Sequence, residues 1–258
     1  KIDDKNQKEL QYNLIRSHSA GIGNPINPES VKAALIVRLN CLRMGYSGIH
    51  TEVIQLLEEL INHNIIPFIP EHGGVGASGD LVQLSHLALV LIGEGKVFYG
   101  NEWRPTEEVY KELGLPPIKA HIREGLSLIN GTSVMTGIAS VNLINARNLL
   151  DWMMIASVMI NEVVQTFDDH YSRSLNAAKR HVGQHKIAAV MQQILNSSKL
   201  TTRREDALFN NENRNGFKIE KKVQEYYSLR CLPQILGPIY DTLVHAEKVV
   251  VDEINSIS

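Results

Sequence analysis

The chain has 258 residues, a formal net charge of −2 and 43% hydrophobic residues. This length and composition exclude an intrinsically disordered chain and predict a globular protein with a sizeable core. The nearly balanced charge leaves no electrostatic footprint for nucleic acid. We find no apolar run long enough to span a bilayer and no signal peptide, so we expect no membrane partner. Cys41 and Cys231 form no metal or redox motif, which favours a reduced, cytoplasmic setting.

Hydrophobic periodicity predicts helices in the first third of the chain, at about 7–19, 29–44, 50–64 and 81–92. Asp80 can N-cap the last of these helices, and Gly93 and Gly95 end it. That helix is apolar on nearly every face, which predicts that it is buried. Residues 96–103 suggest a small β-hairpin.

A second turn signal, Asn130-Gly131, precedes a very long predicted helix. Thr132 or Ser133 can cap this helix, and it runs without proline to about Phe167. At ~1.5 Å per residue it spans roughly 50 Å, a length typical of a bundle or an oligomer core.

The remainder of the chain predicts a polar loop over 196–215 and a last helix from about Pro233 that is still running where the sequence stops. The predicted fold is therefore all-α, with a small β-hairpin near its N-terminal end. We expect either two regions, 1–125 and 126–258, or one continuous domain that is truncated at both ends.

The tripeptide Ala77-Ser78-Gly79 lies in a glycine-rich loop just before the buried helix. The amide nitrogen of Gly79, which has no Cβ to hinder a close approach, can attack the carbonyl carbon of Ala77. Loss of two waters then leaves a five-membered ring whose exocyclic methylene comes from Ser78. This ring, 4-methylidene-imidazol-5-one (MIO), is an electrophile that no ordinary side chain supplies. The following helix N-terminus favours electron density on the ring, and Asp80 can assist the dehydration, cap the helix, or do both.

Residues 74–79 also fit G-x-G-x-x-G, the fingerprint of a dinucleotide-binding loop. We reject that interpretation because the preceding run contains Pro67 and Pro70, which a central parallel strand tolerates poorly. No second strand–helix–strand unit follows either. We therefore expect no nucleotide cofactor.

The segment GGVGASGDL at 73–81 resembles the signature of the aromatic amino-acid ammonia-lyases, which act on histidine, phenylalanine or tyrosine. The similarity continues through 82–88 and along essentially the whole chain. It implies the long-helix fold of that family, an MIO group formed from Ala77, Ser78 and Gly79, and no metal. It also implies a homotetramer whose sites are built from several subunits. The reaction implied is elimination of ammonia, from L-histidine to give urocanate or from L-tyrosine to give coumarate.

The resemblance assigns roles to further residues. Asn130 matches the asparagine that bonds to the MIO group and the substrate amine. The segment 223–231 (VQEYYSLRC) resembles a second family motif, in which Arg230 holds the substrate carboxylate and Tyr227 and Gln224 serve proton handling and substrate contact. A guanidinium suits a carboxylate because the two groups match as a bidentate fork. The spacing of these three residues predicts that they share one face of a helix.

Ser17-His18 stands where the family carries its pair of ring-recognition residues. The Ser-His pair at this place resembles the pair that histidine ammonia-lyases carry. However, the segments 123–137 and 234–238 look most like a flavobacterial branch that includes Ser-His enzymes acting on tyrosine. The resemblance therefore leaves both substrates open.

Two further expectations follow from the resemblance. Family members are about twice this length, so we expect this chain to be a piece of an enzyme that is inactive alone, with its catalytic base and other site residues elsewhere. The alternatives to a lyase are an MIO-dependent aminomutase, which returns ammonia to the β-carbon, and a non-catalytic helical scaffold.

Overall fold

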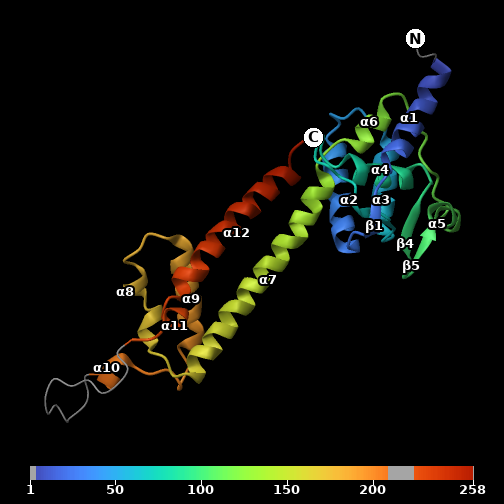
Figure 1. Ribbon diagram of the computed structural model, residues 1–258. Coiled ribbons are helices and arrows are strands. Elements are labelled where there is room, and N and C mark those ends of the chain that lie inside the picture. The colour runs from blue at the N-terminus through green and yellow to red at the C-terminus, as the bar shows by residue number, and fades with distance from the viewer. Residues whose placement is uncertain (1–3, 209–223, 258) are drawn as a thin grey trace, which may run out of the picture. The chain divides into compact units, whose positions relative to one another are not determined.

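The computed structural model describes residues 4–208 and 224–257 and is mostly helical (Figure 1). Its residues fall into two compact units, which we describe separately. Unit 1 comprises the described residues of 1–142 and 248–258, and unit 2 comprises those of 143–247. These units are groups of residues in mutual contact, and the division predicted after residue 125 stays a prediction.

Unit 1 is built from short helices around a buried central one, α4. They are α1 (Asp4–His18), α2 (Pro28–Arg43), α3 (Thr51–Asn62), α4 (Leu81–Leu91), α5 (Thr106–Leu113), α6 (Glu124–Ile129) and the start of α7 (Ser133–Val163). Leu84, Leu87 and Leu91 of α4 are completely buried. The four helices predicted here are thus confirmed, as is the burial of the apolar one.

The strands of unit 1 form two small antiparallel sheets. The first pairs β1 (Ile22–Pro25) with β3 (Pro70–His72), and the second has the order β2 (Ile66–Pro67), β4 (Lys96–Tyr99), β5 (Glu102–Pro105). Gly100 and Asn101 both have positive φ and connect β4 to β5 in the tight turn that hairpins favour. The predicted hairpin is confirmed. The named strands of the described residues pair only antiparallel, which agrees with rejecting the dinucleotide-binding loop.

Unit 2 packs the rest of α7 against α9 and α12. Its elements are η1 (Asp168–Tyr171), α8 (Arg173–Asn176), α9 (Val182–Leu195), α10 (Arg204–Leu208), α11 (Tyr227–Arg230) and most of α12 (Leu232–Ile254). Leu150 and Val158 of α7, Met191 of α9, and Leu232 and Leu236 of α12 share one apolar core. The unit is therefore held together by side chains from three helices that lie far apart in the sequence.

Three predictions about the second half need correction. The long helix ends at Val163 rather than near Phe167, shortly before Gln165 takes a positive φ of 53°. The predicted loop at 196–215 contains α10, and residues 209–215 lie outside the described part of the chain. The last helix starts as predicted but ends at Ile254.

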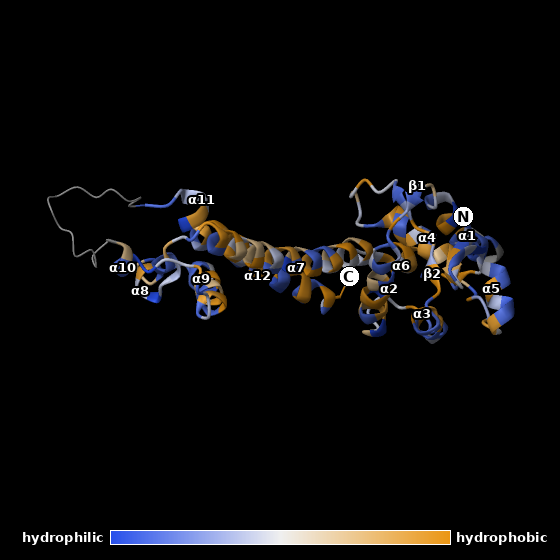
Figure 2. Ribbon diagram, turned by 90° about the horizontal axis from the view of Figure 1, so that it is seen from below, coloured by the Kyte–Doolittle hydropathy of each residue, from blue (hydrophilic) through white to orange (hydrophobic). Residues whose placement is uncertain are grey.

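The helix α7 also corrects the prediction that the chain holds no apolar run long enough for a bilayer. Its 31 residues are long and apolar enough, by length and composition, to cross a membrane. Core helices of large bundles share both properties. Hydrophobic residues are distributed along much of α7 and α12 (Figure 2), and within unit 2 Leu149, Trp152 and Met159 of α7 are largely exposed in the single chain.

Candidate active site

The Ala77–Gly79 loop of unit 1 is folded back on itself between β3 and α4. The backbones of Ala77 and Gly79 form a bridge around Ser78. Gly79 has a φ of +70°, and a Cβ at this position would collide with the carbonyl oxygen of Gly131. Only glycine suits this place. The structure thus brings the two residues that would close the MIO ring together and leaves the Ser78 side chain accessible, so the residues present fit the group.

Asn130 lies beside this loop. Its Nδ2 donates a hydrogen bond of 3.3 Å to Oγ of Ser78. The next residue, Gly131, forms a bridge with Gly79 and accepts a 2.8 Å hydrogen bond from the backbone nitrogen of Asp80. The structure therefore places Ser78 and Asn130 together, although 52 residues separate them in the sequence.

A buried arginine that sequence reasoning missed fixes the segment leading to Asn130. Arg38 of α2 is 1% exposed, and its Nη2 donates to the carbonyl oxygens of Ser127 (2.5 Å), Leu128 (3.1 Å) and Asn130 (2.9 Å). A cation at the carboxyl end of α6 is favourable because the last helical carbonyls lack partners. The sequence signal that could have indicated this burial is that Arg38 is the single charged residue within an otherwise largely apolar stretch of the helix.

The electrostatics around Arg38 involve Asp80. Burial lowers the pKa of the Arg38 guanidinium, while the nearby groups of Cys41 and Asp80 act in the opposite direction. Burial raises the pKa of Asp80, and the charge of Arg38 partly offsets this effect. A buried charge is tolerated when a counter-charge and hydrogen bonds accompany it. Arg38 and Asp80 therefore support each other.

The prediction that the Asp80 side chain caps the following helix, α4, is wrong. Asp80 occupies the N-cap position of α4, but its side chain makes no cap hydrogen bond there. Instead, Oδ2 accepts hydrogen bonds of 2.9 Å from the backbone nitrogens of both Val134 and Met135 at the start of α7. Thr132 does not supply that cap, since its hydroxyl bonds to Glu253. Asp80 thus ties the loop before α4 to the first turn of α7.

Ser17 and His18 end α1, also in unit 1. Oγ of Ser17 donates to the carbonyl of Leu14 (3.0 Å), and Nδ1 of His18 lies 2.9 Å from the same oxygen. A carbonyl oxygen only accepts, so this contact requires a proton on Nδ1. The following loop is anchored where the nitrogen of Gly21 donates to Nε2 of His86 on α4 (3.1 Å).

The second predicted motif lies in unit 2. Tyr227 and Arg230 are the first and last residues of the four-residue helix α11, and the Arg230 guanidinium lies 4.4 Å from the centre of the Tyr227 ring. Buried Tyr171 donates to the carbonyl of Leu229 and holds this helix in place. Gln224 precedes the helix, and Tyr226 is extended (ψ 151°), so the predicted shared helical face is wrong for Gln224.

The chain resembles known proteins over essentially its whole length. The family model described as aromatic amino acid lyase matches residues 1–258. The chain is 43% identical over 257 residues to a tyrosine 2,3-aminomutase of Myxococcus sp. (strain Mx-B0), and 40% identical over 250 residues to a histidine ammonia-lyase of Shouchella clausii. These alignments cover 98% and 96% of this chain but 49% and 47% of the relatives.

The structural comparison agrees. A crystal structure of tyrosine aminomutase from Streptomyces globisporus superimposes with a TM-score of 0.91 at 35% identity, over 99% of this chain and 49% of that one. This likeness confirms the predicted fold. The chain spans about half the length of the relatives it matches.

Proposed function

Because the chain belongs to the aromatic amino acid lyase family, we propose that it supplies the MIO-forming part of an enzyme that removes ammonia from an aromatic L-amino acid. The observation that carries the proposal is the Asn130 amide held against Ser78 in a loop that only glycine can complete at position 79. The family generally uses MIO, and here Ala77, Ser78 and Gly79 would form it.

In the proposed reaction the Cα–N and Cβ–H bonds of the substrate break, a carbon–carbon double bond forms, and ammonia and a proton leave. MIO supplies the electrophile that makes the amine a better leaving group. Asn130 would orient the amine, and Arg230 would hold the substrate carboxylate through its planar fork of donors. Tyr227 and Gln224 would contact the substrate and move protons.

The arrangement of His18 favours a substrate whose ring carries a hydrogen-bond donor. A neutral His18 with its proton on Nδ1, as the contact with the Leu14 carbonyl requires, would offer an acceptor at Nε2. The phenol of tyrosine and the imidazole of histidine can each donate to it, whereas the ring of phenylalanine cannot. We take L-tyrosine as the first substrate to test, because relatives at 43% identity are named for tyrosine.

We further propose that the enzyme is a cytoplasmic homotetramer with shared sites. The exposed apolar side chains of α7 in unit 2, among them Leu149, Trp152 and Met159, support burial against further chains. Tyr227 is 71% exposed, which supports a role toward the MIO group of a neighbouring chain.

An aminomutase is the second candidate, favoured by the similarity to tyrosine 2,3-aminomutases. It would break the same bonds and then add the ammonia to the β-carbon. The product therefore separates the two activities.

The test uses the product of the complete open reading frame with L-tyrosine and L-histidine separately. Growth of a coumarate or urocanate absorption band supports a lyase for that substrate, whereas a β-amino acid detected by chromatography supports the aminomutase. No turnover of either substrate by a soluble, MIO-bearing protein would contradict the proposed function.

A further inference from the structure

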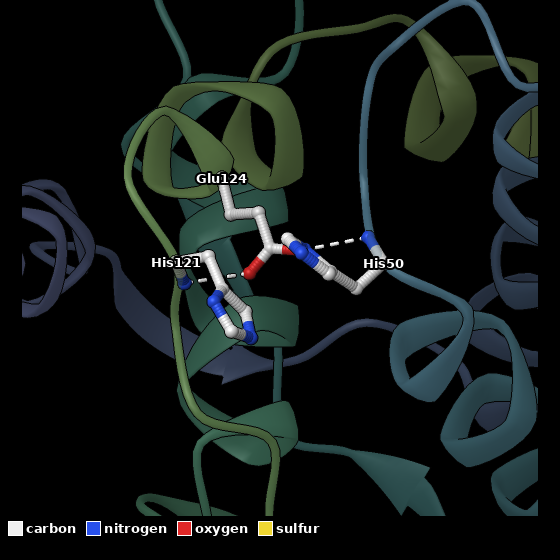
Figure 3. Close-up of side chains that lie close together, drawn as sticks. All are labelled: His50, His121 and Glu124. Carbon is white, nitrogen blue, oxygen red and sulfur yellow. Dashed lines mark hydrogen bonds and ion pairs between the residues drawn. The ribbon is translucent and has the colours of Figure 1, made fainter.

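Three side chains of unit 1 that the proposed reaction does not use converge at the amino end of α6 (Figure 3). They are His50, just before α3, His121, just before α6, and Glu124, the first residue of α6. The carboxylate of Glu124 is 1% exposed, whereas the His50 side chain is 53% exposed. The group therefore combines a buried anion with an imidazole that is open to solvent.

The carboxylate is oriented by surrounding donors. Its Oε1 accepts from the backbone nitrogen of His50 (2.8 Å) and lies 2.7 Å from Nδ1 of the same residue. Its Oε2 accepts from the backbone nitrogen of His121 (2.7 Å). Backbone donors of this kind fix a carboxylate ligand before an ion arrives.

We infer that His50, His121 and Glu124 form a binding site for a zinc-type divalent cation. One ligand atom from each residue already lies within 4.8 Å of the other two. Around tetrahedral zinc such atoms are about 3.3 Å apart, so the group needs to contract by at most about 1.5 Å. The ion would take the place of the proton between Nδ1 of His50 and Oε1 of Glu124.

The donor set also selects the ion. Two imidazoles and one carboxylate suit zinc and its neighbours among the transition metals, whereas magnesium and calcium require oxygen donors. The two imidazole rings are stacked, with centroids 3.7 Å apart and planes inclined by 24°. An imidazole binds a metal in its own plane, so one ring turns out of the stack on binding. Water from the open His50 side completes the coordination.

Binding would have a structural consequence close to Asn130. The ion would join the loop before α3 to the first turn of α6, and Asn130 is the C-cap residue of that six-residue helix. A ligand that binds only the folded state stabilises it. Zinc should therefore raise the unfolding temperature of unit 1, whatever reaction the enzyme catalyses.

The test is calorimetric titration of the chelator-treated product of the complete open reading frame with zinc chloride. We expect one zinc per chain at micromolar concentration, and a loss of affinity of at least about tenfold in His50→Gln and in His121→Gln. Magnesium chloride should give no binding. Thermal unfolding without zinc establishes that each variant is folded, and His50→Gln is favourable in this respect because the side chain is half exposed.

The matched control is His63→Gln. His63 is also exposed and lies 3.2 Å from a carboxylate, that of Glu59, but outside the group of three. Its replacement should leave the affinity unchanged. Absence of stoichiometric zinc binding, or binding that survives both His50→Gln and His121→Gln, would overturn the inference.

Discussion

The two regions that carry the predicted site residues are supported in different ways. In unit 1, the segments that carry Ser78 and Asn130 are held by two charged residues, because buried Arg38 binds the end of α6 and half-buried Asp80 binds the start of α7. In unit 2, Tyr227 and Arg230 occupy a four-residue helix, and Tyr227 is 71% exposed. The first region is therefore organised by contacts within its own unit. Substitutions of the supporting residues Arg38 and Asp80 should affect both stability and ring formation, whereas those at α11 should affect only substrate handling.

The largest expected effect comes from removing the hydroxyl that becomes the methylene. Ser78→Ala cannot form MIO, and we expect kcat/KM to fall at least about 1,000-fold, equivalent to about 4 kcal/mol. Steady-state kinetics of the complete gene product check this. Because Ser78 is exposed, the unfolding temperature should not change. Full activity in this variant would exclude an MIO mechanism.

Replacing the buried arginine should have the next largest effect, which is a loss of folding stability rather than of activity. Arg38→Met leaves three carbonyls without their donor and Asp80 without its counter-charge, and we expect a loss of about 3–5 kcal/mol. The chain has two tryptophans, Trp103 in unit 1 and Trp152 in unit 2. Urea unfolding followed by Trp103 fluorescence in a Trp152→Phe background therefore reports on unit 1.

Arg43→Met, on the exposed end of the same helix, is the control for Arg38→Met. Equal stability losses in the two variants would show that the carbonyl contacts of Arg38 contribute nothing. A smaller yield of MIO in folded Arg38→Lys, read from peptide mass, would sharpen the link between this arginine and Asn130.

A substitution in α11 should separate the two regions. Arg230→Lys keeps the charge but loses the bidentate fork, and we expect KM to rise about 10- to 100-fold. The same variant should show wild-type unfolding by Trp103 fluorescence and a complete MIO group. A stability loss in unit 1 would contradict the separation between the regions.

The smallest expected effect depends on pH. Burial lowers the pKa of His86, and its Nε2 must be unprotonated to accept from Gly21. The folded state therefore binds fewer protons than the unfolded state, so stability is lost as pH falls below the ordinary value of 6.5. His86→Gln keeps an acceptor without titrating. The unfolding free energy of unit 1 between pH 7 and 5 should fall less in this variant, by up to about 1 kcal/mol. Identical pH profiles would contradict this role for His86.

The sequence predicted those features that depend on local pattern. The long helix α7 followed from a proline-free apolar run, and the hairpin β4–β5 from the short run at residues 96–103. Placing Asn130 in the site required the family motif, because no local pattern links residues 52 positions apart.

Other features depend on contacts between distant segments. The side chain of Asp80 caps α7 rather than the helix that follows it, because the two helices start side by side. Burial of Arg38 could be predicted only with knowledge of the carbonyls at residues 127–130. Gln224 was predicted to be helical from spacing, but Tyr226 is extended and the helix begins only at Tyr227.

Formation of MIO is tested most directly by the mass of the peptide that contains Ala77-Ser78-Gly79, released from the purified product of the complete open reading frame. We predict a peptide lighter by two waters than its sequence requires, and a peptide of full mass from Ser78→Ala. An unmodified wild-type peptide from a folded, assembled protein would contradict the claim that this loop forms the catalytic electrophile.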